Sequence, residues 1–223
     1  MTQKDSNVDR PSLTPTVYVV DDEPSVGDLL RRAIARMGYV PAVFLTAKDF
    51  LAAFDPARPG CLILDVHLPD MSGLQLLDVL NERRAPVPVV FMSGRAQFAM
   101  AVHAFKAGSL DFLEKPFTIQ AMEAAIQRAI DTDHKNRELA GKKTDALRKI
   151  DSLTPRERQV MELVVSGRSN KRIADELGLS QKTIEVHRAN VMTKMEAPSL
   201  ADLVRMVVKD AGFDIQQSEA PAD

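Results

Sequence analysis

The sequence has little that would suggest a secreted or membrane-bound protein. It holds a single cysteine, Cys61, which excludes an intramolecular disulfide and is typical of a reducing compartment. None of its apolar runs approaches the roughly 20 residues that a membrane span needs. The segment 1–15 is polar and lacks the apolar core of a signal peptide. We therefore expect a cytoplasmic protein with no membrane partner, in which Cys61 is a small buried side chain.

The chain also lacks a strong overall charge. Its formal net charge is −2, which does not by itself indicate a nucleic-acid partner. The charge is distributed unevenly, because residues 168–194 hold six basic and three acidic side chains, a local excess of +3. A basic segment of this kind can contact phosphates although the whole protein is nearly neutral.

The length of 223 residues predicts two domains. In residues 15–130, short apolar runs alternate with segments of helical periodicity. Strands are expected at 17–20, 40–44, 61–64, 87–92 and 111–113, and helices at 26–37, 74–80, 98–105 and 119–130. Apolar strands that alternate with helices predict a doubly wound α/β domain, with a five-stranded parallel sheet covered on both faces.

The rest of the chain shows no strand pattern. Residues 1–14 and 213–223 are expected to be flexible, and the charged segment 131–150 is expected to be a helical linker that Gly141 weakens. Residues 151–212 predict a second, all-α domain of four helices. Thr154, Pro155 and Glu157 give the pattern of a capping box at its first helix. Its other helices are expected at 170–177, 181–195 and 199–209, and the Gly-containing turn between the first two of these predicts a helix-turn-helix.

Polar side chains follow the strands of the first domain, at the edge where ligands bind in an open α/β sheet. They are Asp21 and Asp22 after the first strand, Asp65 after the third, Ser93 at the end of the fourth and Lys115 after the fifth. Clustered carboxylates need a counter-charge, and Mg²⁺ suits carboxylate and phosphate oxygens. A carboxylate can attack phosphorus to give an acyl phosphate, whose oxygens an ammonium and a hydroxyl would stabilise. The pattern therefore predicts a phosphoryl-accepting site.

Each of these residues also has a plainer interpretation. Asp21 and Asp22 could cap a helix that begins at Pro24, Asp65 and Ser93 could be turn residues, and Lys115 could be an ordinary solvated lysine. Because all of them follow strands in the required order, the joint pattern favours the phosphoryl site. His67 is better explained as an exposed loop residue than as a phospho-relay group.

Together these motifs resemble the receiver domain of two-component response regulators, over residues 15–130. The motifs are Val-Val-Asp-Asp-Glu, Leu-Asp-Val-His-Leu-Pro-Asp-Met-Ser-Gly, Phe-Met-Ser-Gly and Glu-Lys-Pro-Phe. The resemblance implies that a sensor histidine kinase phosphorylates Asp65. It implies that Mg²⁺ is held by Asp21, Asp22, Asp65 and the backbone carbonyl of His67. It also implies switch roles for Ser93, Phe112 and Lys115, with a cis bond between Lys115 and Pro116.

Residues 153–208 resemble the LuxR/FixJ-type helix-turn-helix. The matching stretches are Leu-Thr-Pro-Arg-Glu-Arg, Asn-Lys-Arg-Ile-Ala-Asp-Glu-Leu-Gly-Leu-Ser and Lys-Thr-Ile-Glu-Val-His-Arg-Ala-Asn-Val-Met-Thr-Lys-Met. With the receiver in front, the chain looks most like the FixJ subfamily. The resemblance implies that residues 181–195 form a recognition helix in the major groove of promoter DNA.

The side chains expected to contact DNA lie on the outward face of this helix and at the start of the preceding one. They are Asn170, Lys171, Lys182, Thr183, Glu185, Val186, His187, Arg188, Ala189 and Asn190. Arg188, Asn190 and Glu185 have groups suited to base edges, whereas Lys182, Thr183 and His187 are expected at phosphates. The alternative for each basic residue is a solvated helix face, and His187 could instead be a packed, hydrogen-bonded histidine.

The sequence thus predicts a transcriptional response regulator rather than an enzyme. We expect it to form a homodimer on phosphorylation, through residues 96–130 of the receiver, and RNA polymerase is a further candidate partner. One alternative is a constitutive DNA binder whose receiver serves as an interaction module without phosphorylation. Another is a phosphatase of the haloacid dehalogenase type. That family has a second aspartate two residues after its nucleophilic aspartate, and this chain has His67 at that position, which counts against the alternative.

Overall fold

The computed structural model divides into two units. Five parallel strands form the centre of the first unit. The model describes residues 13–94 and 104–213, and the units are 1–137 and 138–223. The strands are β1 (Thr16–Val20), β2 (Val40–Phe44), β3 (Gly60–Asp65), β4 (Val89–Ser93) and β5 (Asp111–Glu114). They lie in the order β2-β1-β3-β4-β5, and all four pairings are parallel. The predicted five-stranded parallel sheet is confirmed.

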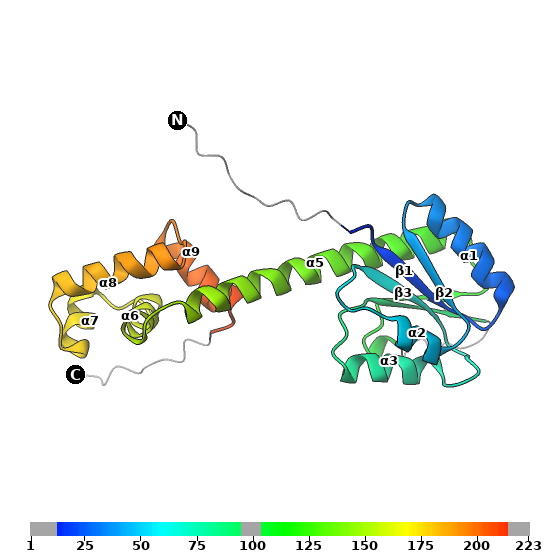
Figure 1. Cartoon of the computed structure of the whole chain (residues 1–223), viewed down its shortest axis with the longest axis horizontal. Coiled ribbons are helices and arrows are strands. Elements are labelled where there is room, and N and C mark those ends of the chain that lie inside the picture. The colour runs from blue at the N-terminus through cyan, green and yellow to red at the C-terminus, as the bar shows by residue number, and fades with distance from the viewer. Residues whose placement is uncertain (1–12, 95–103, 214–223) are drawn as a thin grey trace, which may run out of the picture. The chain divides into compact units, whose positions relative to one another are not determined.

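Helices cover both faces of this sheet (Figure 1). They are α1 (Pro24–Arg36), α2 (Ala47–Ala53), α3 (Gly73–Glu82) and α5 (Ile119–Asp151). Every residue of β1, β3 and β4 is buried, because side chains on either face meet a helical layer. On one face Leu30 and Ile34 of α1 pack with Met122 and Ile126 of α5, and the other face is covered by side chains of α2 and α3.

Several details differ from the sequence-based predictions. Helix α2 was missed, because its seven residues bury only Ala47 and Phe50 and give no periodic signal. In the helices predicted at 26–37 and 119–130, helical spacing places Leu29 and Ile119 with the apolar residues of the buried face, but they are exposed by 55% and 47%. Most of the helix predicted at 98–105 lies outside the described residues, as do residues 1–12 and 214–223, and residues 104–106 are helical.

Helix α5 continues through the whole segment 131–150 that was predicted as a helical linker, and Gly141 lies inside it without ending it. In the first unit, Arg137 of α5 donates to main-chain carbonyls of residues 56–58. In the second unit, Ala146 and Ile150 are buried in the hydrophobic core. One helix therefore contributes side chains to both units.

The second unit consists of the end of α5 followed by α6 (Pro155–Val165), α7 (Asn170–Leu177), α8 (Gln181–Lys194), α9 (Leu200–Val204) and a π-helical turn, η1 (Arg205–Asp210). The capping box at Thr154 and Glu157 is confirmed. Helices α7 and α8 are joined at Gly178, which has φ of 65° and ends α7, so the predicted helix-turn-helix is present. The single helix predicted at 199–209 is divided between α9 and η1, and Leu200, expected in the core, is exposed by 45%.

No helix within the described ranges is both long enough and apolar enough to cross a membrane. The thiol of Cys61 is fully buried, as predicted, and this burial raises its pKa well above the ordinary value. Cys61 is thus a packing residue of the sheet.

Candidate functional site

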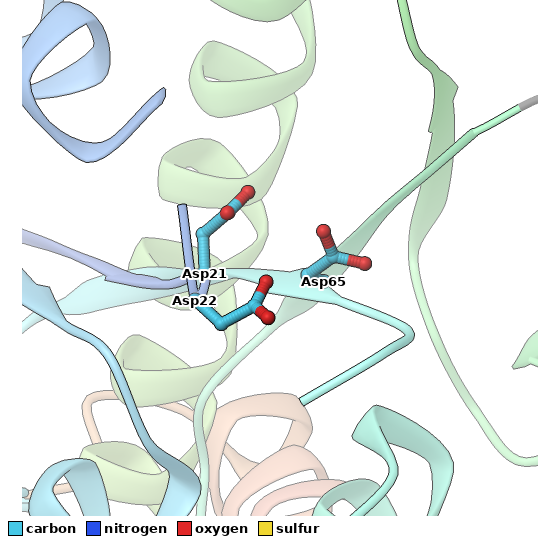
Figure 2. A group of neighbouring side chains, drawn as sticks. All are labelled: Asp21, Asp22 and Asp65. Carbon is cyan, nitrogen blue, oxygen red and sulfur yellow. The ribbon is translucent and has the colours of Figure 1, made fainter. Parts of the chain in front are cut away.

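Three carboxylates meet at the edge of the sheet where β1 and β3 end (Figure 2). Asp21 and Asp22 follow β1, Asp65 is the last residue of β3, and ligand oxygens of the three lie within 4.8 Å of one another. Asp21 is fully buried and Asp65 is 6% exposed, whereas Asp22 is exposed. The capping alternative is not supported, since α1 begins after Glu23 without a side-chain cap.

Lys115 supplies the counter-charge for the two buried carboxylates. Its ammonium donates to Asp21 Oδ2 at 2.6 Å and also to Asp65 Oδ2. Burial lowers the pKa of Lys115, but the hydrogen bonds and charges of the two carboxylates together outweigh burial and hold the pKa above its ordinary value. Lys115 is therefore a charged member of the cluster and not a solvated surface lysine.

The other predicted switch residues lie on the neighbouring strands. Ser93 ends β4 beside β3, is fully buried, and accepts a hydrogen bond from the Lys115 main-chain N–H on its carbonyl at 2.6 Å. Phe112 of β5 is partly buried and packs against the core beneath α2 and α3. The bond between Lys115 and Pro116 is cis, as predicted.

The loop after β3 contributes a main-chain hydrogen bond to the Asp65 carboxylate. The main-chain N–H of His67 donates to Asp65 Oδ1 at 3.0 Å, while the His67 side chain is exposed, as expected for a loop residue. Gly73 is the first residue of α3, and no role was predicted for it from the sequence. A Cβ at Gly73 would lie 2.3 Å from the Asp65 carbonyl oxygen, so only glycine allows this approach.

The donor set is suited to Mg²⁺, which prefers oxygen ligands and usually binds to one or two carboxylates together with water and phosphate oxygens. Two ligands of one Mg²⁺ are separated by at most roughly 4.2 Å, close to the spread of the three carboxylates. An ion held by Asp21, Asp22 and Asp65 would supply charge neutralisation for an incoming phosphoryl group.

On the second unit, eight of the predicted DNA-contacting side chains lie on α8, and the other two, Asn170 and Lys171, lie at the start of α7. Lys182, Glu185, Val186, Ala189 and Asn190 are exposed, while Thr183, His187 and Arg188 are partly buried. Within the helix predicted at 181–195, Ile184, Val191 and Met195 have the spacing of a core-facing side, and all three are buried. Nδ1 of His187 is buried and has no hydrogen-bond partner in the described part of the chain, which favours a packed histidine over a phosphate contact through that atom.

Two polar contacts on this unit were not expected from the sequence. Arg188 Nη1 donates to Asn170 Oδ1 at 2.6 Å, so α8 and α7 are joined by a side-chain hydrogen bond. Lys194 donates to Glu157 Oε2 at 2.6 Å, and this bond is the largest cause that lowers the Glu157 pKa to about 2. Long-range pairs of this kind leave no signal in local spacing.

Family models match both units. The model of the response regulator receiver domain matches residues 17–127, and that of bacterial regulatory proteins of the luxR family matches residues 151–207. The chain therefore belongs to the response regulators that join a receiver domain to a LuxR-type DNA-binding domain. This membership makes it a transcription regulator and implies a histidine kinase and DNA as partners.

Within this class the relatives are of the FixJ type. The transcriptional regulatory protein FixJ of Bradyrhizobium diazoefficiens is 40% identical over 193 residues, which cover 86% of this chain and 94% of the relative. The response regulator protein TodT of Pseudomonas putida is 38% identical over 190 residues, covering 85% of this chain and 84% of the relative.

Solved structures agree with this assignment. The response regulator StyR has a TM-score of 0.79 at 39% identity, covering 88% of this chain and 99% of StyR. Full-length FixJ from B. japonicum has a TM-score of 0.56 at 38% identity, covering 91% of this chain and 100% of FixJ. The similarity thus extends over both domains.

Proposed function

We propose that Asp65 accepts a phosphoryl group from the phosphohistidine of a sensor kinase. An Asp65 carboxylate oxygen forms the new bond to phosphorus as the nitrogen–phosphorus bond of the histidine breaks. Bound Mg²⁺, held by Asp21, Asp22, Asp65 and the backbone carbonyl of His67, would neutralise charge on the transferred group. The observation that carries this proposal is the convergence of Asp21, Asp65 and the Lys115 ammonium at one edge of the sheet.

Phosphorylation would then be sensed by the groups around Asp65. The ammonium of Lys115 already contacts Asp65, so it can follow one phosphoryl oxygen when the acyl phosphate forms. The hydroxyl of Ser93, on the adjacent strand, would donate to another oxygen, and Phe112 would turn inward beside it. These movements change the surface made by β5 and the helices next to it.

This surface is the proposed site of dimerisation, within residues 96–130. Its described part exposes two large apolar side chains, Phe105 by 51% and Ile119 by 47%, and burial of such side chains between two copies is favourable. A dimer would present two α8 helices to paired half-sites of promoter DNA. RNA polymerase is the candidate partner through which bound protein would change transcription.

One experiment separates this function from constitutive DNA binding. The full chain is incubated with Mg²⁺ and acetyl phosphate, and acyl-phosphate formation, mass in solution and affinity for selected DNA are measured. We expect wild type to be labelled, to dimerise and to bind DNA more tightly, and Asp65→Asn to show none of these changes. Asp78→Asn, which changes an exposed carboxylate on α3, is the matched control and should behave as wild type.

The proposal would be wrong if Asp65→Asn were labelled as wild type is and gained the same DNA affinity. If untreated wild type and Asp65→Asn both bound DNA as tightly as treated wild type, the receiver would be an interaction module instead. Omission of Mg²⁺ tests the metal separately, because labelling should then fall sharply while the fold is retained.

A further inference from the structure

We propose that Asn170 is a positioning residue for Arg188, holding the guanidinium of that arginine in place on the recognition helix. This assignment differs from the sequence-based expectation that Asn170 contacts DNA directly. It rests on the proposed sequence-specific DNA binding through α8 and identifies a residue that would set its specificity without reading a base.

The geometry fixes the acceptor before DNA arrives. Asn170 is the first residue of α7, whose start is capped by Ser169, and it is partly buried. Its Oδ1 accepts from Arg188 Nη1 at 2.6 Å, across 18 positions of the sequence. The turn between α7 and α8 is itself fixed by Gly178 in the left-handed region and by Ser180, which caps α8. Asn170 and Arg188 therefore lie on helices α7 and α8, whose ends at the turn are fixed by caps.

Hydrogen bonding to an amide leaves the arginine ready for recognition. A guanidinium has five N–H donors, so one bond to Asn170 leaves the others for a guanine edge or a phosphate. The amide is neutral and does not cancel the positive charge. Lys194 shows the contrast, since its partner is the Glu157 carboxylate, which neutralises it. Arg188 therefore has a positive charge that no carboxylate neutralises in this contact, and that charge can attract DNA, unlike the charge of Lys194.

Restricting Arg188 in advance should matter for affinity. A long side chain loses rotamer freedom when it binds, and a partner that restricts it beforehand reduces that loss. A free arginine can also turn to a nearby phosphate, which gives no sequence information. Removal of the Asn170 amide should therefore weaken binding to the preferred sequence more than binding to random DNA.

The test uses the full chain and a DNA site selected from random sequences with phosphorylated wild type. Affinities for that site, for variants changed at single base pairs and for random DNA are measured by fluorescence anisotropy. For Asn170→Ala we expect about a 3- to 10-fold loss on the selected site, the size of a typical net hydrogen bond, with random-DNA binding changed less than about twofold. Asn170→Ala should lose discrimination at the same base pairs at which Arg188→Ala loses it.

Two further variants distinguish positioning from a direct or merely structural role. In the Arg188→Ala background, Asn170→Ala should have no additional effect, because nothing remains to be positioned. Lys171 is the neighbouring predicted DNA contact, and a lysine contact to phosphate does not distinguish sequences, so Lys171→Ala should weaken binding to selected and random DNA equally. Thermal unfolding of each variant reports whether the helix-turn-helix is intact.

Three results would overturn the assignment. These are an equal loss on selected and random DNA, an undiminished loss in the Arg188→Ala background, or full selectivity in Asn170→Ala. A wild-type protein that selects no sequence would overturn the proposed function as well, so the two failures are distinguishable.

Discussion

The main-chain N–H of Gly60 donates a hydrogen bond to Asp133 Oδ2 at 2.9 Å. Gly60 is the first residue of β3, Asp65 is its last, and Asp133 belongs to α5, so the strand that carries the candidate phosphoacceptor is joined at its other end to the long helix. Asp133 is 1% exposed and also accepts from Arg137 Nε, whose guanidinium donates to the carbonyls of Pro56, Ala57 and Arg58. This network fixes α5 to the receiver as far as Arg137.

Replacement of Arg137 by alanine should destabilise the receiver by about 2–4 kcal/mol, because the Asp133 carboxylate would remain buried without its cation. Urea unfolding of the full chain, followed by circular dichroism, measures the loss. The matched control is Lys142→Ala, which removes an exposed pair with Glu138 one turn apart on the same helix and should cost less than about 0.5 kcal/mol. Equal effects of the two variants would show that the buried network adds no stability.

Replacement of Lys115 by methionine should make thermal stability depend more strongly on Mg²⁺ than it does in wild type. Asp21 and Asp65 would face each other without their shared counter-charge, so the variant should melt at a lower temperature than wild type in EDTA. Added Mg²⁺ should restore part of the difference, because a bound cation replaces the ammonium. Melting temperatures with and without Mg²⁺ test this, and an equal Mg²⁺ effect on both proteins would contradict it.

Gly73→Ala should impair phosphorylation of Asp65. The new Cβ would lie 2.3 Å from the Asp65 carbonyl, so the end of β3 or the start of α3 must shift. Gly141→Ala is the control, since nothing lies within 4 Å of a Cβ built there and alanine favours the helix by about 0.5–1 kcal/mol. Acetyl-phosphate labelling rates compare the two. Wild-type rates in Gly73→Ala would mean that the contact has no role in the site.

Stability of the second unit should fall in acid through Glu157. Its pKa is lowered from 4.5 to about 2, first by Lys194 and then by the Thr154 main chain. A lowered pKa contributes stability that is complete above about pH 4.5 and is lost as pH falls toward 2, by no more than about 3 kcal/mol. Glu157→Gln should flatten this part of the pH profile, measured by urea unfolding. The control Glu162→Gln, at an exposed position on α6, should leave the profile unchanged.

The sheet and the cluster of carboxylates with Lys115 could be predicted because their signals are local. Apolar runs mark buried strands, and residues that follow parallel strands must meet at one edge, so the convergence of Asp21, Asp65 and Lys115 could be predicted without a structure. Helix caps such as Thr154 likewise depend on residues three positions apart. The bounds of β1, β2 and β5 differ from the prediction by one residue or less.

What the sequence did not reveal depends on distant pairs or on weak periodicity. Asp133 and Gly60 are 73 positions apart, and Asp133 reads as one more charge on a polar helix. Leu29 and Leu200 matched helical spacing yet are exposed, because spacing defines a face without defining what covers it. Helix α2 was too short to give a pattern, and the predicted 98–105 helix and flexible ends lie largely outside the described residues.

The shared helix α5 has a practical consequence for exchanging modules between regulators. A fragment that begins at Asp151, where the luxR family match starts, would lose Ala146 and Ile150 from the hydrophobic core of the second unit. It would also lose Lys149, which pairs with Glu196 in the turn that follows α8. Chimeric regulators built from this chain should therefore be joined before residue 138, so that the DNA-binding module keeps the helix segment that completes its interior.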